Sequence, residues 1–272
     1  MTKIGIIIDK HHLENKVSEF LKYLKTIAEV SIYLEESYLL NSSKIKFNED
    51  IFFVKGKGDL ILALAKNVEN ETSIPVINSS RGIWFSMNRF INSVILRKEG
   101  ISVPDFSLKP LNDTPPFEDF IVKNIIDQKR YSFTGKIEKN KGHLRIFDER
   151  ALKEAQGGKE FYQYFYYQKF IKSKWEYKVY GIGDQLFFYK QLPLLVNKNK
   201  MESRVGIDPI SELKEMVLKA MKSLDLKITS VDFLQSKEGK FYLTDINSVP
   251  NFNYIKNGVK IIGNYLLEQA KR

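Results

Sequence analysis

The first 80 residues alternate between strand-like and helix-like patterns, and this alternation constrains the fold more than any other feature of the sequence. Short runs rich in Ile, Val, Phe and Leu predict strands, and segments with apolar residues at helical spacing predict the helices between them. The strands are expected at residues 3–9, 29–35, 50–57 and 73–79, and the helices at residues 12–27 and 59–70. Such short strand–helix units favour a parallel sheet, which predicts an α/β domain over residues 1–80.

After residue 80 the pattern changes to hairpins and longer helices. A helix is expected at residues 81–101, because Gly100 closes it and Pro104 follows. One later hairpin turns at Gly183-Asp184. Further strands are expected at residues 115–125 and 161–171 and in hairpins over 129–147 and 176–192, and further helices at residues 148–158, 211–226 and 258–272. The chain is therefore assigned to the α/β class, with an α+β part after the first domain.

The composition excludes several classes of site and of protein. The chain has no cysteine, so it holds no disulfide, thiolate metal site or cysteine nucleophile. No run approaches the roughly 18 apolar residues of a membrane span. The opening MTKIGIIIDK has too short an apolar part for a signal peptide and reads better as a buried strand. We therefore expect a cytoplasmic protein without a membrane partner.

The positive net charge suggests an anionic partner. The chain has 43 Lys and Arg residues against 33 Asp and Glu residues, which gives +10 at pH 7. Its densest basic stretches, residues 136–145 and 198–204, lack the regular aromatic residues of a single-strand binding surface. An anionic small substrate is therefore expected, and a nucleic acid is the weaker alternative.

Two carboxylates and an amide converge near the C-terminus, in the segment VDFLQSKEGKFYLTDINSVP. A two-residue turn at Glu238-Gly239 would pair its two strands so that Asp232 lies directly across from Asp245. Asn247 shares the face of Asp245, since side chains alternate along a strand. Facing carboxylates repel each other unless a cation lies between them, and Mg²⁺ prefers such oxygen ligands. The alternative is an exposed polar face whose acids pair with nearby lysines.

This hairpin, followed by Pro250, resembles the metal-binding end of the ATP-grasp enzymes, and the resemblance extends over most of the chain. It implies an ATP-grasp fold with an N-terminal parallel α/β domain. A central subdomain would span residues 81–170, and a C-terminal subdomain with the metal site would span residues 171–272. The implied cofactors are ATP and Mg²⁺, with Mn²⁺ as an alternative ion. The implied metal ligands are Asp232, Asp245 and Asn247.

The resemblance also implies two cations for the phosphates. Residues 74–106 are similar to the stretch where family members carry their first phosphate-binding cation, before a Gly-Ile-x-Val-Pro turn. Arg89 stands there in place of the more usual lysine. The sequence FIVK resembles the next strand and gives Lys123 as the second phosphate contact. The apolar neighbours of Lys123 indicate a buried strand, where an unpaired lysine would be costly.

Three further segments carry the resemblance to the rest of the site. YYQKFI resembles the hinge that meets adenine, largely through its backbone. EYKVYGIGD resembles the following strand, which puts Glu176 near the ribose and Lys178 near phosphate or substrate. KMESRVG resembles the segment that ligases use on their acyl intermediate, so that Lys178 and Arg204 are the implied catalytic residues. The implied adenine contacts are Gln168, Lys169, Phe170 and Ile171.

Two departures from the family pattern concern glycines. Many members carry a glycine-rich phosphate loop after the strand of Lys123, whereas residues 124–135 have glycine only at Gly135. The usual glycine after the proline is replaced by Asn251. The first departure argues against efficient catalysis, and the second concerns the substrate loop.

The resemblance leaves the reaction open. ATP-grasp ligases phosphorylate a carboxylate and let an amine attack the acyl phosphate. The helix-and-hinge segment resembles the ribosomal-protein glutamate ligases of this branch, and the branch is favoured because it is the broader one. Inositol polyphosphate kinases share the fold, and YKVYGIGD and DINSVP are at least as similar to them. An ATP-binding module without turnover is the third reading. The acceptor is expected to be set by the N-terminal domain and by the loops at 55–57 and 197–206. An amine-bearing acceptor and an oligomer are both left open.

Overall fold

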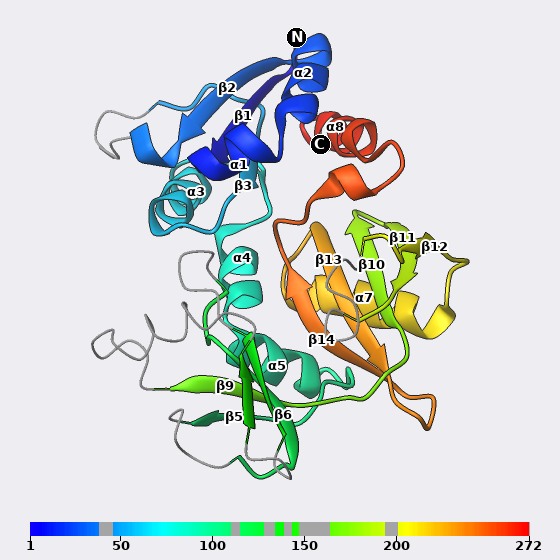
Figure 1. Ribbon diagram of the computed structural model, residues 1–272. Helices are drawn as coiled ribbons and strands as arrows, with labels where there is room; N and C mark the ends of the chain where they lie inside the picture. Colours follow the sequence, from blue (N-terminus) through cyan, green and yellow to red (C-terminus); the bar gives the residue numbers. More distant parts are fainter. Residues whose placement is uncertain are drawn as a thin grey trace.

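The computed structural model describes residues 1–37, 46–109, 115–127, 134–138, 143–146, 164–193 and 201–271. Its strands form one sheet of four strands and two sheets of five. Figure 1 shows the four-stranded sheet at one end of the molecule and the two larger sheets at the other. No helix in the described ranges is long and apolar enough to cross a bilayer.

The N-terminal sheet is parallel, as the strand–helix alternation predicts. Its strands lie in the order β2-β1-β3-β4. The central strands are buried on both faces, which is typical of a parallel sheet between helices. One face packs against α2 and α8 and the other against α3. The elements are β1 (Lys3–Ile8), β2 (Glu29–Leu34), β3 (Ile51–Lys55), β4 (Val76–Ile77), α2 (Ser18–Ile27), α3 (Asp59–Glu71) and α8 (Gly258–Gln269).

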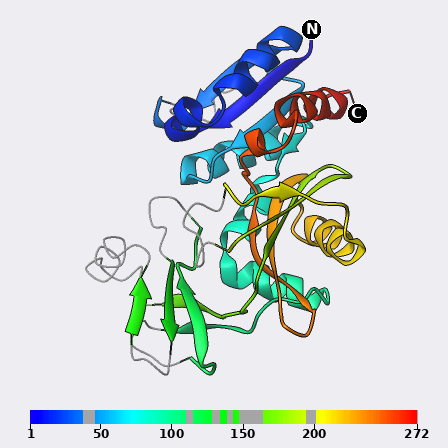
Figure 2. The ribbon, with the colours of Figure 1, turned by 45° about the vertical axis from the view of Figure 1, so that its right-hand side comes forward.

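Helix α8, near the end of the chain, thus completes the apolar core around the N-terminal sheet. Ile262 and Leu266 of α8 are fully buried and belong to the same apolar cluster as Phe20 and Leu24 of α2. Figure 2 shows α8 beside the N-terminal helices from a second direction.

Two of the predicted helices are each divided in the structure. The segment expected as one helix at residues 12–27 forms α1 (Lys10–Asn15) and α2, and the segment 81–101 forms α4 (Ser80–Met87) and α5 (Arg89–Lys98). Asn88 causes the second break. Its backbone is extended, and its side chain accepts the N–H of Ile91, at 3.0 Å, as the cap of the new helix. A side chain that caps the following turn competes with continuation of the helix.

The central sheet is antiparallel, with the order β5-β9-β6-β7-β8. The hairpin expected over 129–147 is present as β7 and β8, whereas the helix expected at residues 148–158 lies outside the described residues. The strands are β5 (Phe106–Lys109), β6 (Asp119–Lys123), β7 (Thr134–Glu138), β8 (His143–Ile146) and β9 (Phe165–Lys169).

The C-terminal sheet has the order β12-β11-β10-β13-β14. The hairpin turn at Gly183-Asp184 is confirmed, since Ile182 pairs with Gln185. One face of the sheet is apolar and packs against α7 and α5. The elements are β10 (Glu176–Ile182), β11 (Gln185–Gln191), β12 (Val205–Gly206), β13 (Ile228–Gln235), β14 (Phe241–Asn247) and α7 (Ser211–Ser223), with single 3₁₀ turns at Glu35–Ser37 and Phe252–Tyr254.

The connection between β13 and β14 differs from the predicted two-residue turn. The strands end at the pair Gln235 and Phe241, and a five-residue loop joins them. Because this loop has five residues and the predicted turn has two, the first strand pairs beyond it are shifted by one residue from the predicted register. A bulge at Thr244 restores it, so that Asp232 still pairs with Asp245, as predicted.

Asn78 joins the N-terminal domain to the C-terminal sheet. Its buried amide donates to the carbonyls of Ile228, at 2.6 Å, and Ser248, at 2.8 Å. Its oxygen accepts the N–H groups of Lys227, at 2.7 Å, and Ile228, at 2.9 Å. This side chain fixes the position of β14's C-terminal end, where the candidate metal ligands lie.

Candidate active site

A row of three charged side chains crosses the face of the C-terminal sheet opposite α7. Lys178 of β10 pairs with Asp232 of β13, which pairs in turn with Asp245 of β14. Residues that face each other across a ladder project to the same side, so the three side chains are neighbours. The ammonium group of Lys178 lies 2.5 Å from a carboxylate oxygen of Asp232.

The oxygen atoms of this row fit a magnesium ion better than a structural metal centre. Asn247 is on the same face, two residues from Asp245, and its side-chain oxygen accepts the N–H of Val249 at 3.0 Å. Such an oxygen keeps a second lone pair for a cation. The described residues contain no group of three or more His, Cys, Asp and Glu side chains that could hold a metal. Two carboxylates and one amide suit Mg²⁺, which keeps several non-protein oxygens in its shell.

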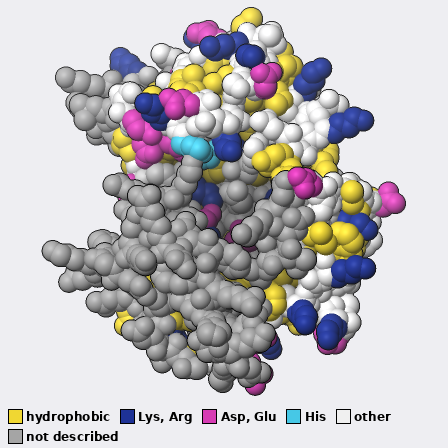
Figure 3. Space-filling view, viewed as in Figure 1, with side chains coloured by type: hydrophobic (Ala, Val, Ile, Leu, Met, Phe, Trp, Pro, Cys, Tyr) yellow, Lys and Arg dark blue, Asp and Glu magenta, His cyan; other side chains and the backbone are white. Residues whose placement is uncertain are grey.

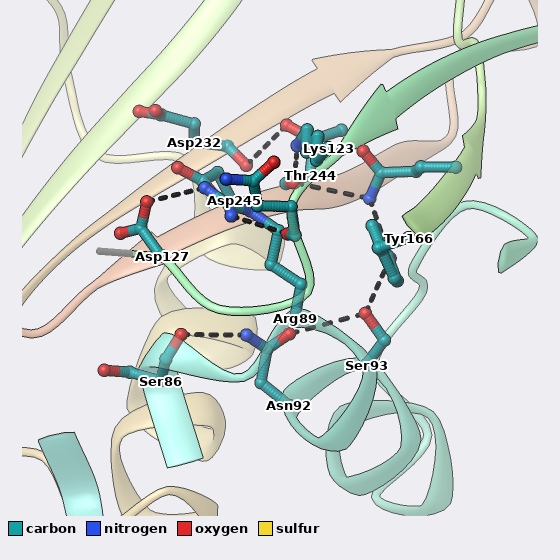
Figure 4. A network of polar contacts seen from close by, with 12 residues as sticks. Ser86, Arg89, Asn92, Ser93, Lys123, Asp127, Tyr166, Asp232, Thr244 and Asp245 are labelled. Carbon is teal, nitrogen blue, oxygen red and sulfur yellow. Dashed lines mark hydrogen bonds and ion pairs between the residues drawn. The ribbon is translucent and has the colours of Figure 1, made fainter. Parts of the chain in front are cut away.

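Arg89 faces this row from the first turn of α5. Its guanidinium donates to the carbonyl of Asn124, at 2.8 Å, and to the carboxylate of Asp127, at 2.6 Å. Its Nε lies 3.9 Å from Asp245, too far for a hydrogen bond, and this buried N–H has no other partner in the described part of the chain. Figure 4 shows Arg89 between the two carboxylates. The arginine predicted to bind phosphate therefore lies beside the predicted metal ligand.

Asp127 is part of the site although the sequence pattern did not indicate it. Its two carboxylate oxygens bind two cations, Arg89 and Lys57, at 2.6 and 2.5 Å. Burial alone would raise the pKa of Asp127, but the two cations hold it well below its usual range. Asp127 lies within residues 124–135, where the resemblance implied a glycine-rich phosphate loop. In the sequence, the hint of a role for Asp127 is that this carboxylate stands in a loop with few glycines.

Lys123 and Gln168 meet on the bulge of β14. The ammonium of Lys123 donates to the carbonyl of Thr244 at 3.1 Å, and the amide of Gln168 donates to the same oxygen at 3.3 Å. Burial lowers the pKa of Lys123, and the nearby Asp245 opposes that shift. The bulge thus leaves a carbonyl free of the ladder, and this carbonyl holds a buried lysine next to the charged row.

A second polar chain begins at Glu176 and ends at Arg204. Gln191 of β11 donates to Glu176 and accepts from Nε of Arg204 at 2.6 Å. The guanidinium of Arg204 also donates to the hydroxyl of Tyr180 at 3.0 Å and lies over the ring of Tyr254, 5.1 Å from its centre. Burial raises the pKa of Tyr180 to about 12, so its hydroxyl stays protonated. The residues expected near ribose and substrate are therefore linked through Gln191, which was not predicted.

The predicted hinge lies between the two larger sheets, but two of its N–H groups are occupied. The N–H of Lys169 donates to the carbonyl of Asp105 at 2.7 Å, and that of Phe170 donates to the carbonyl of Asp119 at 2.8 Å. The Lys169 ammonium lies 3.6 Å from the Asp105 carboxylate. These two N–H groups are not available to a purine. Together with the buried Ile171, Lys169 lines a cavity of about 340 Å³ near Tyr242.

Known proteins resemble this chain in structure but not detectably in sequence. No protein-family profile matches it, and no curated protein matches it. A Chryseobacterium gregarium RiPP-associated ATP-grasp ligase, solved with ADP and a leader and core peptide, superposes with a TM-score of 0.69 at 14% identity, over 99% of this chain and 97% of its own.

Two further solved structures agree. The ATP-grasp RimK-domain protein from Sphaerobacter thermophilus gives a TM-score of 0.70 at 12% identity, over 98% of this chain and 100% of its own. D-alanine–D-alanine ligase from Bacillus anthracis, solved with ATP, gives 0.69 at 16% identity, over 100% of this chain and 98% of its own. The three matches span nearly every residue and confirm the architecture that the sequence resemblance implied: this chain has the ATP-grasp fold.

Proposed function

We propose that this protein is an ATP-dependent ligase that joins a carboxylate to an amine through an acyl phosphate. The observation that carries the proposal is the charged row of Lys178, Asp232 and Asp245, which faces Arg89 and the buried Lys123. Fixed cations and carboxylates on one face are what phosphoryl transfer requires, because catalysis there is mainly positioning and charge neutralisation. The fold-related proteins named above include a RiPP-associated ATP-grasp ligase and a D-alanine–D-alanine ligase, which favours ligation over other uses of ATP.

In this proposal Asp232, Asp245 and Asn247 hold Mg²⁺. The ion would neutralise the negative charge that develops on the transferred phosphoryl group. Arg89 and Lys123 approach the same place from the central part of the chain and would hold the phosphate oxygens. Mn²⁺ would suit the same oxygen ligands.

Adenine would lie at the hinge and ribose near Glu176. Because the N–H groups of Lys169 and Phe170 are occupied, the purine would meet the other polar groups of residues 168–171. Glu176 presents a carboxylate that already accepts from Gln191, which holds it in one orientation for the ribose hydroxyls.

Arg204 and Lys178 would serve the substrate side. A carboxylate oxygen attacks the γ-phosphorus and ADP leaves, and the amine then displaces phosphate from the acyl carbon. Arg204 is held by Gln191 and Tyr180 and would bind the acyl phosphate, while Lys178 would offset charge beside Asp232. The substrate is proposed to be an amino acid or peptide that bears a carboxylate. A kinase that phosphorylates a hydroxyl of an anionic small molecule is the alternative.

The test is incubation with Mg-ATP and hydroxylamine in the presence of amino-acid and acidic-peptide pools, followed by mass spectrometry. Hydroxylamine converts an acyl phosphate to a hydroxamate, so a hydroxamate that requires ATP supports the ligase. A product that gains one phosphate and no hydroxamate indicates the kinase. Asp245→Asn should abolish product. The matched control Asp184→Asn changes an exposed acid of the same sheet and should leave product unchanged.

A further inference from the structure

Lys57 reaches the candidate site from the N-terminal domain. It follows β3 and precedes α3, between Gly56 and Gly58. A Cβ on Gly56 would lie 2.1 Å from the side chain of Ile61, and one on Gly58 would lie 1.9 Å from the carboxylate of Glu35. A side chain at either position would displace Ile61 or Glu35, so the two glycines allow close packing on both sides of Lys57.

The ammonium of Lys57 and the guanidinium of Arg89 bind the same carboxylate from opposite sides. Lys57 contacts Oδ2 of Asp127 at 2.5 Å, and Arg89 contacts Oδ1 at 2.6 Å. The side chain of Lys57 is 15% exposed and that of Arg89 is 10% exposed. A buried arginine and a partly buried lysine from different parts of the chain thus bind one carboxylate. Asp127 is 70 residues from Lys57 and 38 residues from Arg89 in the sequence.

The oxyanion lies next to the proposed metal and phosphate groups. Arg89 bridges Asp127 and Asp245, and its buried Nε has no hydrogen-bond partner among the residues that the structure describes. A buried donor without a partner is costly, which indicates that this N–H is arranged for an acceptor other than the protein. Figure 3 shows basic and acidic side chains inside a hollow below the N-terminal domain.

We propose that Lys57 and Arg89 together bind the γ-phosphate of ATP, and that the carboxylate of Asp127 fills this oxyanion site in the structure and yields it to the nucleotide. The inference rests on the proposed function and adds a phosphate contact from the N-terminal domain. It also gives Asp127 a role as a competitor of the phosphate.

The charge balance supports this exchange. Among the described residues, the cluster contains four cations, Lys57, Arg89, Lys123 and Lys178, and three carboxylates, Asp127, Asp232 and Asp245. These side chains carry one net positive charge. If Asp127 withdraws, they carry two, and one Mg²⁺ raises the sum to four, which matches a fully ionised triphosphate. With Asp127 in place, ATP would be under-neutralised in a partly buried site, where charge imbalance is expensive.

The test compares ATP with ADP in calorimetric titrations at fixed Mg²⁺. Lys57→Met should weaken ATP binding by about tenfold or more, the usual effect of losing one charge-assisted contact, while ADP affinity changes less than about twofold. Asp127→Asn should tighten ATP binding several-fold, since the competitor loses its charge. Lys66→Met, on the exposed side of α3, is the matched control and should change neither affinity.

The results that would overturn the inference are distinct from a failure of the proposed function. If Asp127 instead holds Lys57 and Arg89 in position for the nucleotide, Asp127→Asn will weaken ATP binding. If Lys57 binds the acceptor substrate, Lys57→Met will leave the ratio of ATP to ADP affinity unchanged. Lys57→Arg retains the charge and should bind ATP within about threefold of the parent, which separates loss of the contact from loss of the fold. A parent protein that binds neither nucleotide would overturn the proposed function as well.

Discussion

Replacing Asn78 by aspartate should destabilise the protein strongly, although the two side chains have nearly the same shape. The amide nitrogen of Asn78 donates to the carbonyls of Ile228 and Ser248, and both hydrogen bonds are buried. In Asn78→Asp an ionised oxygen would face these two carbonyls. The N–H groups of Lys227 and Ile228 would keep an oxygen acceptor, so only the two hydrogen bonds donated by the amide nitrogen would be lost.

The size of the effect follows from counting the two carbonyls. A buried polar group that loses its partner costs about 1–3 kcal/mol, so two of them lower the free energy of unfolding by about 2–6 kcal/mol. At about 2–4 °C per kcal/mol for a chain of this size, the melting temperature should fall by roughly 10 °C. Because a protonated carboxyl can donate, the deficit should shrink as the pH falls through the raised pKa of the introduced group.

Urea denaturation and thermal melts at pH 8 and pH 5 measure both effects. The control is Asn253→Asp, at an exposed residue whose amide makes one contact of 3.3 Å with the carbonyl of Lys16. That substitution should change the free energy of unfolding by less than about 0.5 kcal/mol. A variant at Asn78 that stays within about 1 kcal/mol of the parent would refute the account of this amide as the link between domains.

Three further outcomes are expected. The affinity for ATP should fall sharply in excess chelator, because Asp232, Asp245 and Asn247 are proposed to act through Mg²⁺. Calorimetric titration with and without chelator measures the two affinities. Equal affinities would contradict the metal assignment. Asp245→Asn should change the nucleotide-free stability by at most about 1 kcal/mol, because it relieves repulsion from Asp232 but also removes attraction to Arg89 and Lys123. ATP-dependent turnover should nevertheless fall by orders of magnitude. A larger fall in melting temperature with turnover preserved would mean that Asp245 serves the fold. Burial, with a smaller contribution from Lys57, lowers the pKa of Lys55 from 10.5 to about 7. Between pH 7 and about 10, Lys55 therefore keeps its proton in the unfolded chain but not in the folded one, so the free energy of unfolding should rise with pH in this window. Lys55→Met should flatten this rise, which chemical denaturation at several pH values measures. The same pH dependence in the variant and the parent would show that Lys55 does not titrate there.

The sequence predicts the parts of this fold that depend on local pattern. Alternation of strands and helices predicts the parallel sheet, because buried strands and amphipathic helices differ in their apolar period. The pairing of Asp232 with Asp245 was also predicted, but by two errors that cancel, since the five-residue loop and the bulge at Thr244 each shift the register by one. Bulges depend on packing across the sheet, which local pattern does not contain.

The contacts that assemble the candidate site could not be predicted from local pattern. Asp127 and Lys57 are 70 residues apart, in loops that follow strands of different sheets. Gln191 joins Glu176 to Arg204 only because β11 pairs with β10. The resemblance supplied Arg89 and Lys123 as cations near phosphate, which remains a prediction, while their protein partners required the structure.

The packing of α8 against the first sheet has a consequence for how the protein forms during translation. Phe20 and Leu24 need Ile262 and Leu266 to complete their apolar cluster, and these partners are made about 240 residues later. At about 5–20 residues per second, the emerging N-terminal segment waits tens of seconds on the ribosome with that face of its sheet exposed. The central sheet, whose last strand β9 ends at Lys169, can form in the meantime, whereas β14 of the C-terminal sheet ends shortly before α8 begins. The domain synthesised first should therefore be the last to reach its native packing, and it is the one that a chaperone would be expected to hold.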